Sequence, residues 1–161
     1  MKTSTLILGL FISLLFIISS CTTSGDREST LEEGFRYSIC TPLNPAIIEK
    51  GDIAKEDIMK TLEAFPWQMY LLQMTTVSDA SEIYYSPSLE FENKANQHGI
   101  LASAVGAPDQ YEFYIFYKKP PTQKGGEDAI IYLEGQTKED VVACVQALII
   151  GDQEFLDARF E

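Results

Sequence analysis

The chain has 161 residues, of which 24 are acidic and 12 are basic, so its net charge at pH 7 is −12. Nucleic-acid binding needs clustered lysines and arginines, which are limited here to Lys118-Lys119 and isolated residues, and we therefore exclude nucleic acid as a partner. The length suits one domain with one core. Such acidity is typical of a well-solvated surface, and the alternative is an acidic face that meets a basic protein partner.

The start of the chain has the organisation of a secretion signal. An apolar run over residues 6–18 follows the first lysine, and it is too short for the roughly 20 residues of a membrane-spanning helix. Ile18-Ser19-Ser20-Cys21 comes next and resembles the lipobox of bacterial lipoproteins. That resemblance implies removal of residues 1–20, acylation of the Cys21 sulfur and anchoring to a membrane through the lipid. The alternative is an ordinary secreted protein.

The residue after the cysteine bears on location. Thr22 in place of an aspartate resembles an outer-membrane address, so we expect a lipoprotein of the bacterial outer membrane that faces the periplasm or the cell surface. Removal of Lys2 with the signal leaves 11 basic and 24 acidic side chains, a net charge of −13. This charge repels anionic lipid, so the lipid anchor is the predicted contact with the membrane.

Residues 21–34 are predicted to form a lipidated, flexible and acidic tether, because TTSGDRESTLEEG has no hydrophobic periodicity. Residues 35–161 are predicted to form a single α+β domain. Its first part, residues 35–45, contains aromatic residues and two prolines, and we expect an extended segment that lies on the domain.

The domain proper is predicted to open with a helix. Asp52 can cap it, and apolar residues follow at helical spacing: Ile58, Met59, Leu62 and Phe65. Pro66 either ends this helix or lies in the first turn of a second helix, and the periodicity over residues 67–74 favours the second option. A strand over residues 67–77 is the remaining alternative.

The middle of the chain predicts an antiparallel meander. Leu89 and Phe91 alternate with Glu90 and Glu92, which indicates a strand with one apolar and one acidic face. Further strands are expected over 100–105, 111–117 and 129–133, separated by turns at 96–99 and 106–109 and by a loop at 118–126. Sequential strands joined in this way usually pair as neighbours.

The last predicted element is a helix. Thr137 and Asp140 resemble a capping box, apolar residues follow at helical spacing, and Gly151 is expected to end the helix. A short terminal turn over residues 155–160 should fold back on the core. The predicted fold is therefore an N-terminal helix, a four- to five-stranded antiparallel meander sheet and a C-terminal helix packed on one face.

Two cysteines remain once Cys21 carries lipid. Cys40 and Cys144 could form a disulfide in an oxidising compartment, which would restrain a loop of about 100 residues. The alternative is that Cys144 is a small core residue and Cys40 is only covered.

Few residues in the sequence indicate catalysis or metal binding. His98 is the only histidine and lies in a predicted turn, where we expect a solvated role. The spacing of the cysteines, the histidine and the acids fits neither zinc nor calcium, and no nucleophile or phosphate-binding motif occurs, so we expect no catalytic residues, no metal and no cofactor.

The stretch from Tyr111 to Tyr117 carries aromatic residues on both predicted faces. A central strand covered on both sides explains this pattern. The functional alternative is one partly open face that binds a protein, because rigid aromatic rings give contact area at low entropic cost. Its candidate residues are Tyr84, Tyr85, Glu90, Glu92, Glu112, Tyr114 and Phe116.

The segment from Ser86 to Pro120, with SPSLEFEN, ILASAVG and EFYIFYKKP, followed by a helix ending near GDQEFL, resembles small bacterial immunity-type proteins. The resemblance implies neutralisation of a toxin by contact. We therefore expect a lipid-anchored envelope binding protein without catalytic activity that meets a basic protein partner. The alternatives are a structural or accessory subunit of an envelope assembly and, least favoured, a hydrolase of envelope polymers.

Overall fold

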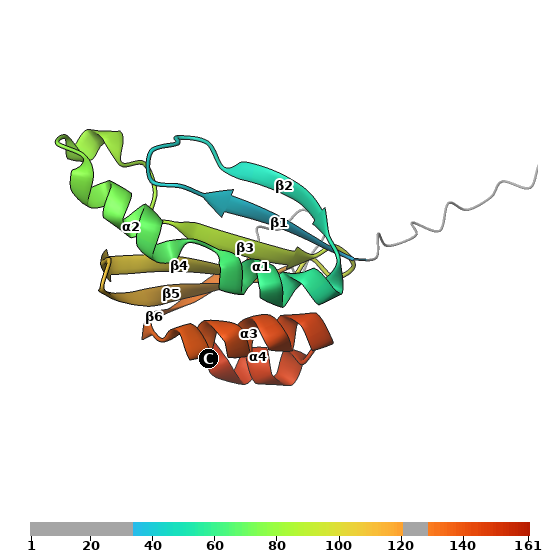
Figure 1. Cartoon of the computed structure of the whole chain (residues 1–161). Coiled ribbons are helices and arrows are strands. Elements are labelled where there is room, and N and C mark those ends of the chain that lie inside the picture. The colour runs from blue at the N-terminus through green and yellow to red at the C-terminus, as the bar shows by residue number, and fades with distance from the viewer. Residues whose placement is uncertain (1–33, 121–128) are drawn as a thin grey trace, which may run out of the picture. The chain divides into compact units, whose positions relative to one another are not determined.

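The chain folds around an antiparallel sheet of six strands (Figure 1). The computed structural model describes residues 34–120 and 129–161, and these belong to one compact unit, Leu31–Glu161. The strand order is β2-β1-β3-β4-β5-β6. The bounds are β1 Phe35–Cys40, β2 Ile48–Ile53, β3 Ser88–Asn93, β4 Gly99–Ala107, β5 Gln110–Lys119 and β6 Ala129–Gln136. Cys21, the signal segment 1–20, the tether up to residue 33 and residues 121–128, which include most of the predicted loop 118–126, lie outside the described residues.

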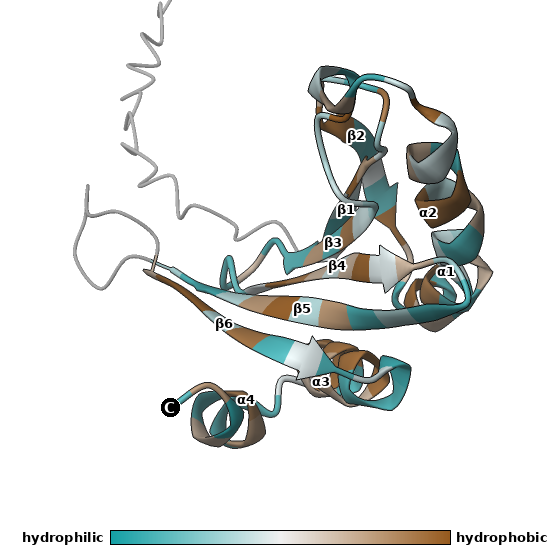
Figure 2. Ribbon diagram, turned by 90° about the vertical axis from the view of Figure 1, so that its left-hand side faces the viewer, coloured by the Kyte–Doolittle hydropathy of each residue, from teal (hydrophilic) through white to brown (hydrophobic). Residues whose placement is uncertain are grey.

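Four α-helices accompany the sheet within the described ranges. They are α1 Ile58–Ala64, α2 Trp67–Thr76, α3 Lys138–Ile150 and α4 Gln153–Arg159, and short 3-10 turns cover Lys55–Asp57 and Ala80–Glu82. The helices lie on one face of the sheet (Figure 1, Figure 2). Within residues 34–120 and 129–161, no helix combines the length and the apolar composition that crossing a membrane requires.

The core lies between the helices and this face of the sheet. On β5, Phe113, Ile115 and Tyr117 are buried, because alternate side chains of a strand point to the same side. Ile58 and Leu62 of α1, Trp67 and Leu71 of α2, and Val141, Cys144, Val145 and Leu148 of α3 complete the buried cluster. The indole ring of Trp67 meets the Phe113 ring edge to face at 5.0 Å.

The predicted helix α3 is confirmed together with its ends. The Thr137 hydroxyl accepts a hydrogen bond from the Asp140 amide, and the Asp140 carboxylate accepts one from the Thr137 amide, so the capping box is complete. Gly151 ends the helix with a φ of +76°, a left-handed conformation that favours glycine. Leu156 and Phe160 of the terminal segment are buried, so this segment folds back on the core as expected, but it forms the helix α4 and not a short turn.

The pairing of β3 through β6 as successive neighbours is also confirmed. A second helix, α2, follows Pro66, so the strand alternative for residues 67–77 is wrong. Pro66 itself lies directly before this helix and not in its first turn.

Three expectations need correction. The domain does not open with a helix but with the hairpin of β1 and β2, and Asp52 lies in β2, opposite Arg36, and caps no helix. The sheet has six strands and not four or five. Residues 35–40, expected to lie on the domain, pair with both β2 and β3 inside the sheet. The sequence IEKGDI of β2 has little apolar alternation because β2 is an edge strand with solvent on much of its surface.

Candidate binding surface

The sheet face opposite the helices, which we call the open face, has no helix over it in the described part of the chain (Figure 2). Strand alternation determines which side chains reach it, since residues on either side of a buried one point away from the core. Register and hydrogen bonds join these residues across the strands. The open face includes Arg36, Ser38, Cys40, Glu49, Ser88, Glu90, Glu92, Leu101, Ser103, Val105, Glu112, Tyr114, Phe116, Lys118, Ile130 and Tyr132.

One row across the open face changes from polar to apolar. Ser38 of β1 stands opposite Glu90 of β3, and Glu90 stands opposite Leu101 of β4. Leu101 is opposite Phe116, which in turn is opposite Tyr132. Along this row the side chains on β1 and β3 are hydrophilic and those on β4 to β6 are hydrophobic. We therefore call the two parts of the face the hydrophilic half and the hydrophobic half, the second of which also carries the polar Ser103 and Lys118.

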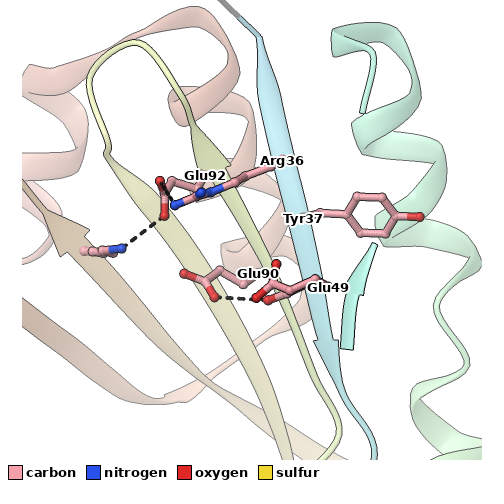
Figure 3. A pocket seen from close by; sticks show the side chains of 7 residues that line it. Arg36, Tyr37, Glu49, Glu90 and Glu92 are labelled. Atoms are coloured by element: carbon pink, nitrogen blue, oxygen red, sulfur yellow. Dashed lines mark hydrogen bonds and ion pairs between the residues drawn. The ribbon is translucent and has the colours of Figure 1, made fainter. Parts of the chain in front are cut away.

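The hydrophilic half contains a pocket of about 210 Å³ (Figure 3). The side chains that line it are three carboxylates, two cationic groups and a hydroxyl, which belong to Glu49, Glu90, Glu92, Arg36, Lys118 and Ser38. Tyr37 also borders the pocket, but its ring points away from the carboxylates and packs against the core (Figure 3). We refer to it as the polar pocket.

Glu92 is the fixed centre of the polar pocket. Its Oε1 accepts a hydrogen bond from Arg36 Nη2 at 2.7 Å, and its Oε2 accepts one from Lys118 Nζ at 3.0 Å. The Glu92 side chain is only 8% exposed. A buried carboxylate is tolerated when its charge is paired and hydrogen bonded, so Glu92 orients both cations and holds them at the pocket wall.

Glu90 has a different environment from Glu92. Its Oε2 accepts a hydrogen bond from the Ser38 hydroxyl at 3.2 Å. Burial raises the pKa of Glu90, the charges of Glu92 and Glu49 raise it further, and the Ser38 hydrogen bond and Lys118 oppose these effects. Since both cations bind Glu92, negative charge remains at Glu90 and Glu49, and a cationic group entering the pocket would offset it.

A second pocket of about 190 Å³ lies on the hydrophobic half and shares Glu90 and Lys118 with the polar pocket. Its other lining residues are Leu101, Phe116 and Ile130, and we call it the apolar pocket. Beside it, the rings of Phe116 and Tyr132 lie 5.5 Å apart. Together the two pockets can accommodate a basic side chain next to an aliphatic or aromatic one.

The structure brings together most of the predicted binding residues. Glu90, Glu92, Tyr114 and Phe116 share the open face. Glu112 is on the same face, because it alternates with the buried Phe113, but it lies toward the other end of β5, opposite Val105. Tyr84 and Tyr85 lie outside the strands, in a segment whose hydrogen bonds run to Pro42 and Pro45 in the connection between β1 and β2.

Sequence reasoning missed the cations of the polar pocket and part of the apolar pocket. The alternation in FRYSIC, with Arg36 and Ser38 between apolar residues, is a strand signal that could have placed both on the face of Glu90 and Glu92. No local pattern indicates that Lys118 reaches Glu92, because they are 26 residues apart.

Of the two alternatives for the cysteines, the structure has the second. Cys40 and Cys144 are free thiols, and both are buried. Cys40 alternates with Ile39 and so belongs to the open face, whereas Cys144 lies in the core on α3, so the sheet separates them and the possible disulfide is not formed. Burial is the largest cause that raises the pKa of Cys40, and it raises the pKa of Cys144 to about 11, so both thiols are weak nucleophiles at neutral pH.

His98 is not simply solvated, as its predicted turn suggested. It is half-buried, its ring stacks on Tyr117, and its Nδ1 lies 2.7 Å from the Tyr117 hydroxyl. Burial lowers the pKa of His98. Among residues 34–120 and 129–161, no group of three histidine, cysteine or acidic side chains is arranged to hold a metal ion.

Comparison of the chain with protein-family models, with curated proteins and with solved structures found no match.

Proposed function

We propose that the chain is a lipid-anchored envelope protein that binds a basic protein partner through its open face and has no catalytic activity. The observation that supports this most is the position of the polar pocket directly beside the apolar pocket on the sheet face opposite the helices. Protein interfaces commonly combine a hydrophobic anchor with charged groups around it.

The charge of the chain supports a basic partner. The chain carries twice as many acidic as basic side chains, so its field attracts a cationic protein and accelerates the encounter. Within the polar pocket, Glu90 and Glu49 would accept a lysine or arginine of the partner. Such a cation also stabilises the ionised form of Glu90, which the pocket alone disfavours.

Two finer versions of this function remain. In the first, the chain is an immunity-type protein that covers a basic toxin, as the resemblance over Ser86 to Pro120 implies. In the second, it is an accessory subunit of an envelope assembly, and the exposed Ile130 and Tyr132 favour this version because permanent interfaces are the more hydrophobic ones. A partner that copurifies in fixed stoichiometry favours the subunit, and an inducible toxic partner favours immunity.

Site-specific photo-crosslinking in the native host tests the open face. A photoreactive amino acid at Tyr114 should join the chain to one basic protein. The matched control is the same amino acid at Leu72, an exposed residue of α2 on the helix side of the domain. It should give no crosslink to that protein.

The captured partner then allows a quantitative test of the polar pocket. We expect Glu49→Gln with Glu90→Gln to weaken its binding at least about fivefold, since two favourable charge contacts are lost. Glu63→Gln, a change of an exposed acid on α1, should leave the affinity unchanged. Equal crosslinking from Tyr114 and Leu72, or equal affinity of all variants, would contradict the proposed binding face.

A further inference from the structure

Strand β6 forms one edge of the sheet. It pairs with β5, and among the described residues no strand pairs with its other side. Its sequence is AIIYLEGQ, in which Glu134 is the one charged residue. From Ala129 to Leu133 the register with β5 is regular, so this part of the edge presents an uninterrupted row of outward backbone groups.

The opposite edge of the sheet differs in ways that discourage strand addition. Strand β2 reads IEKGDI, with three charged side chains in six residues. Its register with β1 shifts between Tyr37 and Ser38, next to Gly51 with a φ of +86°. Charges and bulges are the usual means by which proteins protect an edge strand, and the regular part of β6 has neither.

The side chains of β6 are also unusually apolar for an edge. Ile130 is 62% exposed and Tyr132 is 52% exposed on the open face, while Ile131 and Leu133 are half-buried against the core side. A strand that is regular, apolar on both faces and uncharged over five residues is suited to pairing with another strand.

We propose that β6 pairs antiparallel with β6 of a second copy of this chain, which joins two six-stranded sheets into one sheet of twelve strands. A two-fold axis through the middle of the strand, at Ile131, relates the copies, so each contributes the same surface. The open faces of the two copies then lie on the same side of the joined sheet. Ile130 and Tyr132 of both copies adjoin across the new pair.

The exposed side chains of β6 favour a second copy in antiparallel orientation. Antiparallel pairing about Ile131 places Ile130 of each copy opposite Tyr132 of the other, and both side chains are exposed on the open face. The regular part of the edge is therefore complementary to itself, because apolar side chains meet apolar side chains across the new pair. Lys118 and Lys119 of the neighbouring strand β5 form ion pairs with Glu92 and Asp157 and do not take part.

The oligomeric state of the full chain tests this inference, and no binding partner is needed. The chain as isolated from its native host is held in detergent micelles at about 0.15 M salt, where charges more than about 8 Å apart are largely screened. We expect a dimer by light scattering for the native chain and a monomer for the double variant Ile130→Lys with Tyr132→Lys. Circular dichroism checks that the variant remains folded.

Two single variants are matched controls, because they place the same lysine on exposed apolar residues elsewhere. Leu72 is 54% exposed on α2 and Ile150 is 70% exposed at the end of α3. Both Leu72→Lys and Ile150→Lys should remain dimeric. A native chain that stays monomeric over the accessible concentrations, a β6 double variant that still dimerises, or controls that dissociate as fully as the double variant would each overturn the inference.

Crosslinking distinguishes β6 pairing from any other dimer contact. A short bis-maleimide should join two copies that carry Tyr132→Cys and should not join copies that carry Leu72→Cys. If the dimer forms but only the Leu72→Cys chain crosslinks, the copies meet elsewhere and the proposed pairing is wrong.

Discussion

Glu90 and Glu92 illustrate how two identical side chains, two residues apart on one strand, acquire different properties. Glu92 lies between Arg36 and Lys118 and stabilises the fold as a paired charge. Glu90 has a hydroxyl for a partner, and burial and its acidic neighbours raise its pKa above the ordinary value of 4.5. The alternation of acids in SLEFEN predicted that both share a face, but the positions of the cations, which come from β1 and β5, decide which glutamate is paired.

Replacement of Glu90 tests this difference through stability. A carboxyl whose pKa is raised in the folded state destabilises that state when ionised, so we expect Glu90→Gln to raise the free energy of unfolding at pH 7. As the pH falls through the raised pKa toward 4.5, Glu90 of the native chain takes up a proton and its stability should approach that of the variant. Urea unfolding at pH 7 and pH 5 measures both effects.

Glu112→Gln is the control for this experiment, because Glu112 lies on β5 and is exposed. It should change stability little at either pH. A Glu90→Gln variant that is less stable than the native chain at pH 7 would show that the Ser38 hydrogen bond outweighs the burial of the charge.

At the level of elements, a buried hydroxyl connects β5 to the C-terminal helix α4. The Tyr117 hydroxyl contacts His98 Nδ1 and accepts a hydrogen bond from Gln153 at the start of α4. Burial raises the pKa of Tyr117 to about 12, so it remains protonated and can donate to the imidazole. The Phe160 ring at the end of α4 packs 5.2 Å from the Tyr117 ring.

We therefore expect Tyr117→Phe to destabilise the fold by about 1 kcal/mol, because it removes a buried hydroxyl that hydrogen bonds the half-buried His98 and Gln153. Denaturant unfolding measures the loss, and hydrogen exchange should show it first in α4. Tyr37→Phe, the same change in a half-buried residue of β1, is the comparison. Equal effects of the two variants would mean that the hydroxyl of Tyr117 has no special role.

The elements differ in how far local sequence determines them. Helix α3 was predictable to its ends, because Thr137, Asp140 and Gly151 supply its caps within the segment itself. Strand β2 was not predictable from local sequence, because backbone groups make its pairing with β1 and its polar side chains show little periodicity. The binding residues were predictable where they alternate on β3 and β5, and unpredictable where distant strands bring partners to them.

For the molecule as a whole, the lipid anchor is the prediction on which location depends. We expect Cys21→Ser to abolish acylation and to release the chain from the membrane fraction, because the chain then lacks the acyl groups that would hold it. Mass spectrometry of the native chain should show a mature N-terminus at Cys21 with added acyl mass. Cys40→Ser is the control and should leave membrane association unchanged.

Failure of this test would appear as equal membrane association of the native chain and Cys21→Ser, or as an intact Met1 on the native protein. The open face and the β6 edge would remain features of the fold in that case, and only the proposed location would be lost.

The sequence by itself determined the local features: the charge, the signal-like start, the capped helix α3 and the alternation of Leu89 and Phe91 with Glu90 and Glu92. These depend on residues close together in the chain, so their physical causes can be read there. Only the tertiary structure decided that the hairpin of β1 and β2 completes the sheet, that Arg36 and Lys118 both reach Glu92, and that Cys40 and Cys144 lie on opposite faces. Each of these depends on strand order and register, which bring together residues far apart in the chain.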